Sequence, residues 1–348
     1  MMAMRERKII VFTISKPIIG GAQLWVSNLI RLLGSDYELH IITSRRGWLS
    51  DNCYGATVHY VSNLDGLGLT TFFRLNSCLK SISPDVVVSN SAFAGVYTRC
   101  SSIFNNFRNI YVSHGWSSLY KKGLGSIFFL HIERFLSHFT DYILCVSKSD
   151  VEKACNVIGI KKNKIKLISN SVFINSLDEK KDALKLPVGF NVVFVGRMEP
   201  PKRPDIFVSL LARLPDVNGY IVGEGTLRKD LALNKTDNIT FLGEVSGFNN
   251  FNMFDLFVLS SDSEGLPMSA IQALSQGVPI LISDVGGCSE VLSVAHPNGM
   301  LCENSLESFY SNFMEIYNNY DFYKKNSELA RSEYDILNDR DKFDQLFN

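Results

Sequence analysis

Two side chains that can bind hydroxyl groups, Glu264 and Gln272, lie on either side of a loop and the start of a predicted helix. The apolar run at 256–259 predicts a strand just before them. At about 1.5 Å rise per residue, Gln272 lies about one turn inside the helix. The unpaired amides at the helix start, around Met268 and Ser269, favour a phosphate. These residues therefore predict a site for a phosphorylated ligand held between Glu264 and Gln272.

Two cations follow another predicted strand. Residues 191–195 are apolar, end at Gly196, and lead into a proline-rich loop that carries Arg197 and Lys202. A loop free of strand pairing can project both cations towards one diphosphate. The alternative is a pair of solvated surface charges.

The N-terminal apolar run at 9–14 leads to Gly20 and Gly21 and then to a helical pattern. The loop is not Gly-x-Gly-x-x-Gly, so the dinucleotide fingerprint is absent. Two glycines still let a diphosphate approach the backbone closely. An ordinary tight turn is the alternative interpretation.

His114 follows a predicted strand and precedes Gly115. The carboxyl end of a strand is where an open parallel sheet places ligand-binding residues, although a lone histidine is otherwise more often structural. The other five histidines form no ligand-like cluster, and the seven cysteines include no Cys-x-x-Cys pair. We therefore expect no metal and no cofactor.

The elements that must position these residues alternate between strand and helix. Alternation of this kind predicts parallel sheets with right-handed crossovers. In the helix after Glu264, Pro267 suits the first position and Gly277 suits the C-terminal cap. Further strands are predicted at 38–43, 58–61, 85–89, 109–112 and 142–146.

A chain of 348 residues exceeds one ordinary core, so we expect two domains. The polar stretch 171–190, which includes the charged run 178–182, suits a linker. It divides the chain into an N-terminal domain, 1–170, and a C-terminal domain, 171–348. The sequence offers one stripe of apolar residues for a final helix: Tyr334, Ile336, Leu337, Phe343 and Leu346.

Several of these motifs together resemble retaining glycosyltransferase family 4. Glu264, seven residues and Gln272, followed by Ala-Leu-Ser-Gln-Gly-Val-Pro, looks like the Glu-x7-Glu signature of that family, with Gln272 in place of the usual second Glu. The resemblance covers nearly the whole chain. Its other landmarks are Gly20-Gly21-Ala22-Gln23, Ser113-His114-Gly115, Val195 to Lys202, Val222 to Gly225, Phe241-Leu242-Gly243 and Asp284 to Gly287.

The resemblance implies an α/β protein of the GT-B fold, with two Rossmann-like doubly wound domains facing a cleft. The final helix would cross back to the first domain. The implied activity is retaining, metal-independent transfer of a hexose-type sugar from a nucleoside diphosphate donor, with UDP expected, to a glycan or lipid-linked hydroxyl in surface polysaccharide or lipopolysaccharide synthesis. The residues implied in catalysis are His114, Arg197, Lys202 and Glu264. Those implied in donor binding are Gly20, Gly21, Gly196, Gly223, Val245, Met268, Ser269 and Gln272.

Other activities fit the same architecture. A sugar-nucleotide epimerase or an inverting transferase would use a similar donor site, and Gln272 leaves open a non-catalytic sugar-nucleotide binding protein. Thirty-five basic and thirty-five acidic side chains give a net charge of zero, which argues against a nucleic-acid partner.

The cellular location follows from what the chain lacks. No apolar run approaches the roughly twenty residues that span a bilayer, so we expect a cytoplasmic protein. Lys121 and Lys122 precede an apolar helical pattern at 127–139 that includes Arg134. This pattern fits either a core helix or an amphipathic helix on the anionic inner face of the cell membrane; the weak basic face favours the core helix.

Overall fold

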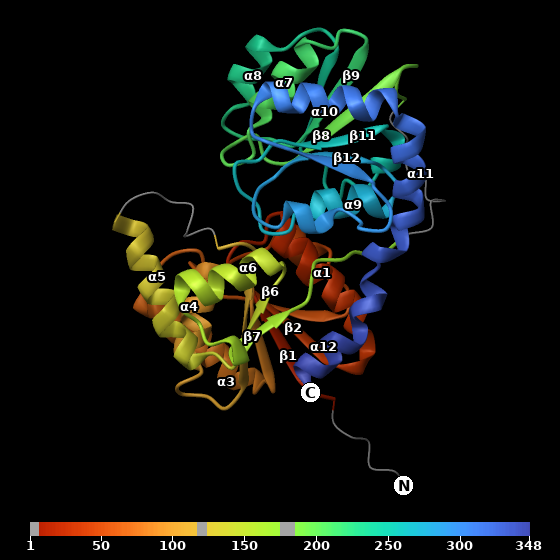
Figure 1. Cartoon of the computed structure of the whole chain (residues 1–348). Coiled ribbons are helices and arrows are strands. Elements are labelled where there is room, and N and C mark those ends of the chain that lie inside the picture. Colours follow the sequence, from red (N-terminus) through yellow and green to blue (C-terminus); the bar gives the residue numbers. More distant parts are fainter. Residues whose placement is uncertain (1–6, 117–123, 175–184) are drawn as a thin grey trace. The chain divides into compact units, whose positions relative to one another are not determined.

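The computed structural model describes residues 7–116, 124–174 and 185–348. Contacts divide the chain into two compact units (Figure 1). Unit 1 contains residues 1–169 together with 339–348, and unit 2 contains residues 170–338. Lys121, Lys122 and the charged run 178–182 of the predicted linker lie outside the described residues.

Unit 1 is built on one parallel sheet with the strand order β3-β2-β1-β4-β5-β6-β7. Its strands are β1 Ile9–Thr13, β2 Glu38–Thr43, β3 Ala56–Tyr60, β4 Val86–Ser89, β5 Arg108–Ser113, β6 Tyr142–Cys145 and β7 Ile165–Leu167. Its α-helices are α1 Gly21–Leu33, α2 Trp48–Asp51, α3 Leu69–Ile82, α4 Ala92–Ser101, α5 Leu124–Leu136, α6 Lys148–Glu152 and α12 Arg340–Phe347.

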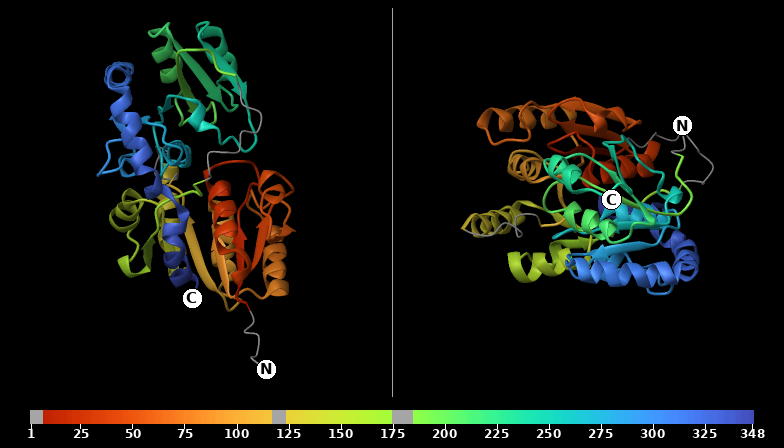
Figure 2. Two further views of the ribbon diagram at one scale, coloured as in Figure 1. Left: turned by 90° about the vertical axis from the view of Figure 1, so that its right-hand side faces the viewer. Right: turned by 90° about the horizontal axis from the view of Figure 1, so that it is seen from above.

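The strand order reverses between β1 and β4, and this reversal decides which face each helix covers. Right-handed crossovers place α1 on one face and α3 to α6 on the other. The two faces are visible in the turned views of Figure 2. Buried Val11, Val87, Leu75 and Tyr97 form the core beneath α3 and α4.

The final helix, α12, belongs to unit 1 and packs beside α1. The ring of Phe343 lies 6.0 Å from that of Trp25, and Phe347 is fully buried. Lys8 and Arg108 donate to the carbonyls that end α12. The sequence prediction that the last helix returns to the first domain is therefore confirmed.

The predicted apolar stripe of that final helix is only partly right. Phe343 and Leu346 are buried in α12, but Leu337 is 59% exposed. Tyr334 and Ile336 are buried within unit 2, on short 3₁₀ turns that precede α12. The stripe is interrupted because the chain passes between the two units at residue 339.

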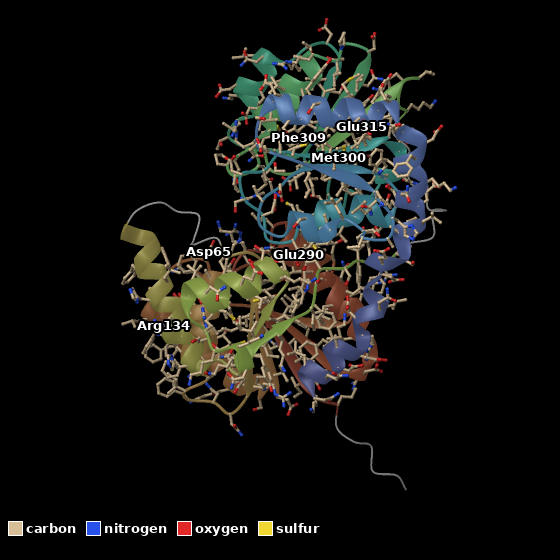
Figure 3. All side chains as sticks on the ribbon, in the orientation of Figure 1. Asp65, Arg134, Glu290, Met300, Phe309 and Glu315 are labelled. Atoms are coloured by element: carbon tan, nitrogen blue, oxygen red, sulfur yellow. The ribbon has the colours of Figure 1, made fainter. Side chains whose placement is uncertain are left out.

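Unit 2 is a second parallel sheet, with the order β10-β9-β8-β11-β12-β13. On α10, which spans Leu306–Asn318, Phe309 is fully buried whereas Glu315 is exposed (Figure 3). Its strands are β8 Phe190–Val195, β9 Val217–Val222, β10 Ile239–Gly243, β11 Leu256–Leu259, β12 Ile280–Ser283 and β13 Gly299–Cys302. Its α-helices are α7 Pro204–Ala212, α8 Arg228–Asn234, α9 Met268–Ser275, α10 Leu306–Asn318 and α11 Tyr320–Ala330.

The two doubly wound α/β units agree with the fold predicted from the sequence. Strand β7 was not predicted, because it is only three residues long, follows a lysine-rich stretch and forms an edge of the sheet. Within the described ranges, no helix combines the length and the apolar content needed to cross a bilayer.

Candidate functional site

The site predicted in unit 2 is organised by an ion pair between two loops. Lys202 follows β8 and Glu264 follows β11, and these two strands are neighbours in the sheet. Lys202 Nζ lies 2.5 Å from Glu264 Oε1, with only 20% and 11% of the two side chains exposed. The structure thus brings together two predicted catalytic residues that are 62 positions apart.

Further hydrogen bonds fix both loops. Ser261 Oγ donates to the same Glu264 oxygen at 2.5 Å. The backbone N–H of Asp262 donates to the Pro201 carbonyl at 2.7 Å, and Ser260 Oγ donates to the Arg203 carbonyl, also at 2.7 Å. Glu264 is therefore oriented before any ligand arrives, which is what preorganised electrostatic stabilisation requires.

Two glycines allow backbone to touch backbone in this region. A Cβ at Gly223 would lie 2.0 Å from the Gly196 carbonyl oxygen, and one at Gly286 would lie 1.9 Å from the Glu264 carbonyl oxygen. Both residues have positive φ, +137° and +58°. Only glycine fits such positions without moving the neighbouring loop. The two predicted donor-binding glycines, Gly196 and Gly223, therefore lie against each other.

Helix α9 begins beside Glu264. Its first residue, Met268, is buried, while Ser269 and Gln272 are half-buried and share a face because they lie three residues apart. The first amides of a helix have no partner within it, so they are available to an anion. Among the described residues, the Gln272 side-chain amide has no hydrogen-bond partner.

The predicted ends of α9 need one correction. Pro267 is the N-cap, not the first helical residue, because its ψ of 112° is extended. Gly277 follows the helix with φ +71°, and its N–H donates to the Leu274 carbonyl at 2.9 Å. That geometry terminates the helix as predicted.

Arg197 and Lys202 have different partners in unit 2. The Arg197 guanidinium pairs with Glu199 at 2.5 Å and is 65% exposed, whereas Lys202 is mostly buried against Glu264. Val245 lies just after β10 and is 40% exposed. A diphosphate clamp formed by both cations stays a prediction.

In unit 1, His114 ends up close to the point where the strand order reverses. It follows β5, and its Nε2 lies 3.2 Å from Oδ1 of Asn90, the residue after β4. The ring of Trp25 on α1 meets the His114 ring edge-on at 5.4 Å. Gly20 and Gly21, at the start of α1, are exposed.

The hydrogen bonds of Asn90 select one tautomer of His114. Asn90 Nδ2 donates to the Val88 carbonyl, so its oxygen faces the imidazole. An amide oxygen only accepts, and therefore His114 Nε2 carries the proton and Nδ1 keeps a lone pair. Burial lowers the pKa of His114 from 6.5 to about 4. The ring is thus neutral at pH 7 and presents an acceptor.

Three residues that support the predicted site were not identified from the sequence. They are Asn90, Ser261 and Asn170, whose Nδ2 donates to the carbonyl of Leu266 at 2.8 Å. Each of them lies directly after a strand or near its end, and this position was the one sequence signal that could have marked it as a candidate site residue. In the part of the chain that the structure describes, no three His, Cys, Asp or Glu side chains gather as a metal-binding group.

Comparison with known proteins assigns the family. Residues 19–175 match the family model "Glycosyltransferase Family 4", and residues 178–333 match "Glycosyl transferases group 1". The chain is 38% identical over 330 residues to the Escherichia coli O-antigen biosynthesis glycosyltransferase WbnH, covering 94% of this chain and 95% of that protein. The chain belongs to glycosyltransferase family 4. The resemblance noted in the sequence is confirmed.

A further relative and a solved structure extend the comparison. An Escherichia coli enzyme named UDP-Gal:alpha-D-GlcNAc-diphosphoundecaprenol alpha-1,3-galactosyltransferase is 26% identical, covering 86% of this chain and 85% of that protein. The structure of Anabaena HepE in complex with UDP and glucose has a TM-score of 0.84 at 18% identity, covering 97% and 98% of the two chains. The two units of this family 4 chain thus have the GT-B fold.

Substitution of Gly286 tests the tight approach to Glu264 in this glycosyltransferase. Gly286→Ala places a methyl group 1.9 Å from the Glu264 carbonyl, whereas the control Gly247→Ala has a similar φ of +67° and nothing within 4 Å. The left-handed backbone destabilises both variants by about 1–2 kcal/mol. The free energy of unfolding, measured in urea, should fall by roughly 1–3 kcal/mol more in Gly286→Ala than in the control, since the overlap forces a backbone shift. An equal decrease in the free energy of unfolding of the two variants would show that the loop relieves the overlap without further destabilisation.

A second prediction concerns the protonation of His114. Nitrogen-15 NMR should show a neutral Nε2–H ring above pH 5, with a pKa near 4. Because this pKa is below the unfolded value of about 6.5, the folded state should lose stability as the pH falls from about 6.5 to about 4. Asn90→Asp puts a carboxylate beside the ring and should raise the pKa. A wild-type pKa near 6.5 would contradict the described packing.

Proposed function

We propose that this glycosyltransferase transfers a hexose-type sugar from a UDP-sugar to a hydroxyl of a lipid-linked or glycan acceptor, with retention of anomeric configuration and without a metal. The observation that carries the proposal is the buried Lys202–Glu264 pair beside the start of α9. It joins a cation, a carboxylate and unpaired helix amides at the carboxyl edge of one sheet, where nucleotides bind in doubly wound folds.

The chemistry demands stabilisation of a leaving diphosphate. The bond between the anomeric carbon and the phosphate oxygen breaks, negative charge grows on UDP, and the sugar becomes cationic. The acceptor oxygen then bonds to the anomeric carbon on the same face, and its proton passes to the departing phosphate oxygen. Lys202 and the α9 amides would stabilise the leaving charge, and Glu264 would hold sugar hydroxyls.

The remaining candidate residues have roles that suit this reaction. We assign Gln272 to the ribose, where an amide both donates and accepts, and Arg197 to the diphosphate after it exchanges Glu199 for the ligand. Gly20, Gly21, Gly196 and Gly223 would let backbone approach the donor, and Val245 would border the base. Neutral His114 would accept a hydrogen bond from a donor-sugar hydroxyl at Nδ1.

Named relatives support the choice of donor and pathway. WbnH is named for O-antigen biosynthesis, and the 26% identical enzyme is named for a UDP-galactose donor and a diphosphoundecaprenol acceptor. The HepE structure holds UDP and glucose. We therefore propose that the reaction belongs to surface polysaccharide or lipopolysaccharide biosynthesis. A cytoplasmic location is part of the same proposal.

Product stereochemistry tests the proposal directly. We expect proton NMR of the product from a UDP-α-sugar to show an α linkage, and we expect the rate to persist in EDTA. A β linkage would identify an inverting transferase, and an epimerised donor would identify an epimerase. Donor binding without transfer to any acceptor would identify a binding protein.

Kinetics of Lys202 variants test the role of the ion pair. Lys202→Ala should lower kcat by roughly a hundredfold or more, since loss of one preorganised charge-stabilising group costs about 2.7–4 kcal/mol, and should change the donor KM less. Lys202→Arg should recover part of the rate because the charge remains. Lys229→Ala, an exposed position on α8 of the same unit, serves as the control. Near-normal turnover of Lys202→Ala would remove Lys202 from the mechanism.

A further inference from the structure

An arginine in unit 2 has a backbone conformation that residues with side chains rarely adopt. Arg203, the residue after Lys202, has φ +48° and ψ +51°, in the left-handed region, and forms the N-cap of α7. The Cβ destabilises a residue there, so the conformation persists only where its surroundings enforce it. Strained backbone of this kind is concentrated at functional sites. The contacts that hold Arg203 therefore bear on the site that Lys202 forms with Glu264.

The Arg203 guanidinium joins two carboxylates. Its Nε and Nη2 donate to the two oxygens of Asp205 on α7 at 2.9 and 2.8 Å, and its Nη1 donates to Asp262 Oδ1 at 3.2 Å. A planar guanidinium bound through two nitrogens to one carboxylate has a fixed orientation, so the third nitrogen has a fixed position as well. This contact adds a charged link between the loop that carries Lys202 and the loop that carries Glu264.

Asn304 extends these contacts to two further loops. Its Nδ2 donates to the same oxygen of Asp262 at 2.9 Å and to the carbonyl of Ser261 at 2.8 Å. Its Oδ1 accepts from the hydroxyl of Ser283. An amide nitrogen only donates and an amide oxygen only accepts, so these three partners together determine which way the amide points.

The contacts cross four neighbouring strands at the carboxyl edge of the sheet. Strands β8, β11, β12 and β13 pair in that order, and the first three are labelled in Figure 1. Ser261 connects the contacts to the ion pair, because its carbonyl accepts from Asn304 while its hydroxyl donates to Glu264. Four side chains thus form a loop network: Arg203, Asp262, Ser283 and Asn304.

The loop network is poorly suited to stabilisation alone. The side chains of Arg203 and Asp262 are 37% and 49% exposed, and ion pairs with this exposure contribute little to stability. The left-handed backbone of Arg203 opposes even that contribution. What the network supplies is a defined geometry for the loops that it joins, which is what preorganised electrostatic stabilisation requires.

We propose that Arg203 and Asn304 are positioning residues for the sugar transfer, and that they act through Ser261 to hold Glu264 against Lys202. The proposal rests on the proposed function, since that function assigns the leaving diphosphate to Lys202 and the sugar hydroxyls to Glu264. Without the loop network the ion pair still forms, but the two loops no longer fix where it lies relative to the start of α9.

Arg203→Gly is the sharpest test, because glycine adopts the left-handed backbone freely and has no guanidinium. Its urea unfolding midpoint should equal or exceed that of wild type, while its kcat should fall roughly tenfold to a hundredfold, with a smaller change in the donor KM. Arg203→Lys keeps the charge but loses the two-nitrogen contact, so it should recover only part of the rate. Arg213→Ala should keep the wild-type kcat; Arg213 caps the other end of α7 and forms an exposed ion pair with Glu307.

Asn304→Ala removes the donors to Ser261 and Asp262 and should lower kcat by a similar factor. A second measurement reads the ion pair without any transfer. Nitrogen-15 NMR of lysine side chains should show a slowly exchanging Lys202 ammonium in wild type, identified by its absence in Lys202→Arg. Arg203→Gly and Asn304→Ala should shift or remove that signal, and Arg213→Ala should leave it unchanged.

Two results overturn the proposal. One is a near-normal kcat in both Arg203→Gly and Asn304→Ala. The other is a lower unfolding midpoint in both variants with an unchanged Lys202 ammonium signal, which would assign the loop network to the stability of unit 2 alone. If wild type transfers no sugar, the proposed function fails, whereas loss of the ammonium signal in the two variants still shows that the loop network holds the ion pair.

Discussion

The parallel arrangement of both sheets is the constraint on which the candidate site depends. In a parallel sheet every strand-to-helix loop leaves from the same edge, so loops that follow neighbouring strands meet in space. Strands β8 and β11 are neighbours, and the loops after them therefore place Lys202 against Glu264. In unit 1 the neighbours β1 and β4 place Ser15 beside Ser91 by the same logic, with their hydroxyl oxygens 2.7 Å apart.

Close packing fixes the geometry of the two loops that carry Lys202 and Glu264. Glycines at positions 223 and 286 let carbonyl oxygens approach where a side chain would collide, and hydrogen bonds from Ser261 and Asn170 hold the loops that carry Glu264 and Leu266. A catalytic site benefits from groups that need no rearrangement as charge develops. The stability of these loops and their proposed chemical role therefore have the same origin.

Unit 1 shows a similar link between the core and the candidate site. Helix α12 packs its Phe343 ring on Trp25, and Trp25 in turn contacts the ring of His114. The last residues of the chain thus support a side chain at the carboxyl edge of a sheet. In contrast, α3 leaves Leu69 and Phe73 in water, which yields no packing energy in the isolated unit.

The sequence by itself determined the two doubly wound units, the order of most strands along the chain, and the loops that carry Glu264, Lys202 and His114, because hydrophobic periodicity and glycine positions are local signals. It missed β7, a three-residue edge strand that follows a lysine-rich stretch, and it treated as one stripe the residues from Tyr334 to Leu346 that two units divide. Only the tertiary structure decided that Ser261 and Lys202 share one oxygen of Glu264 and that Asn90 sets the tautomer of His114. Those contacts join residues from different strands, and their distances depend on strand order and side-chain packing, which no local pattern records.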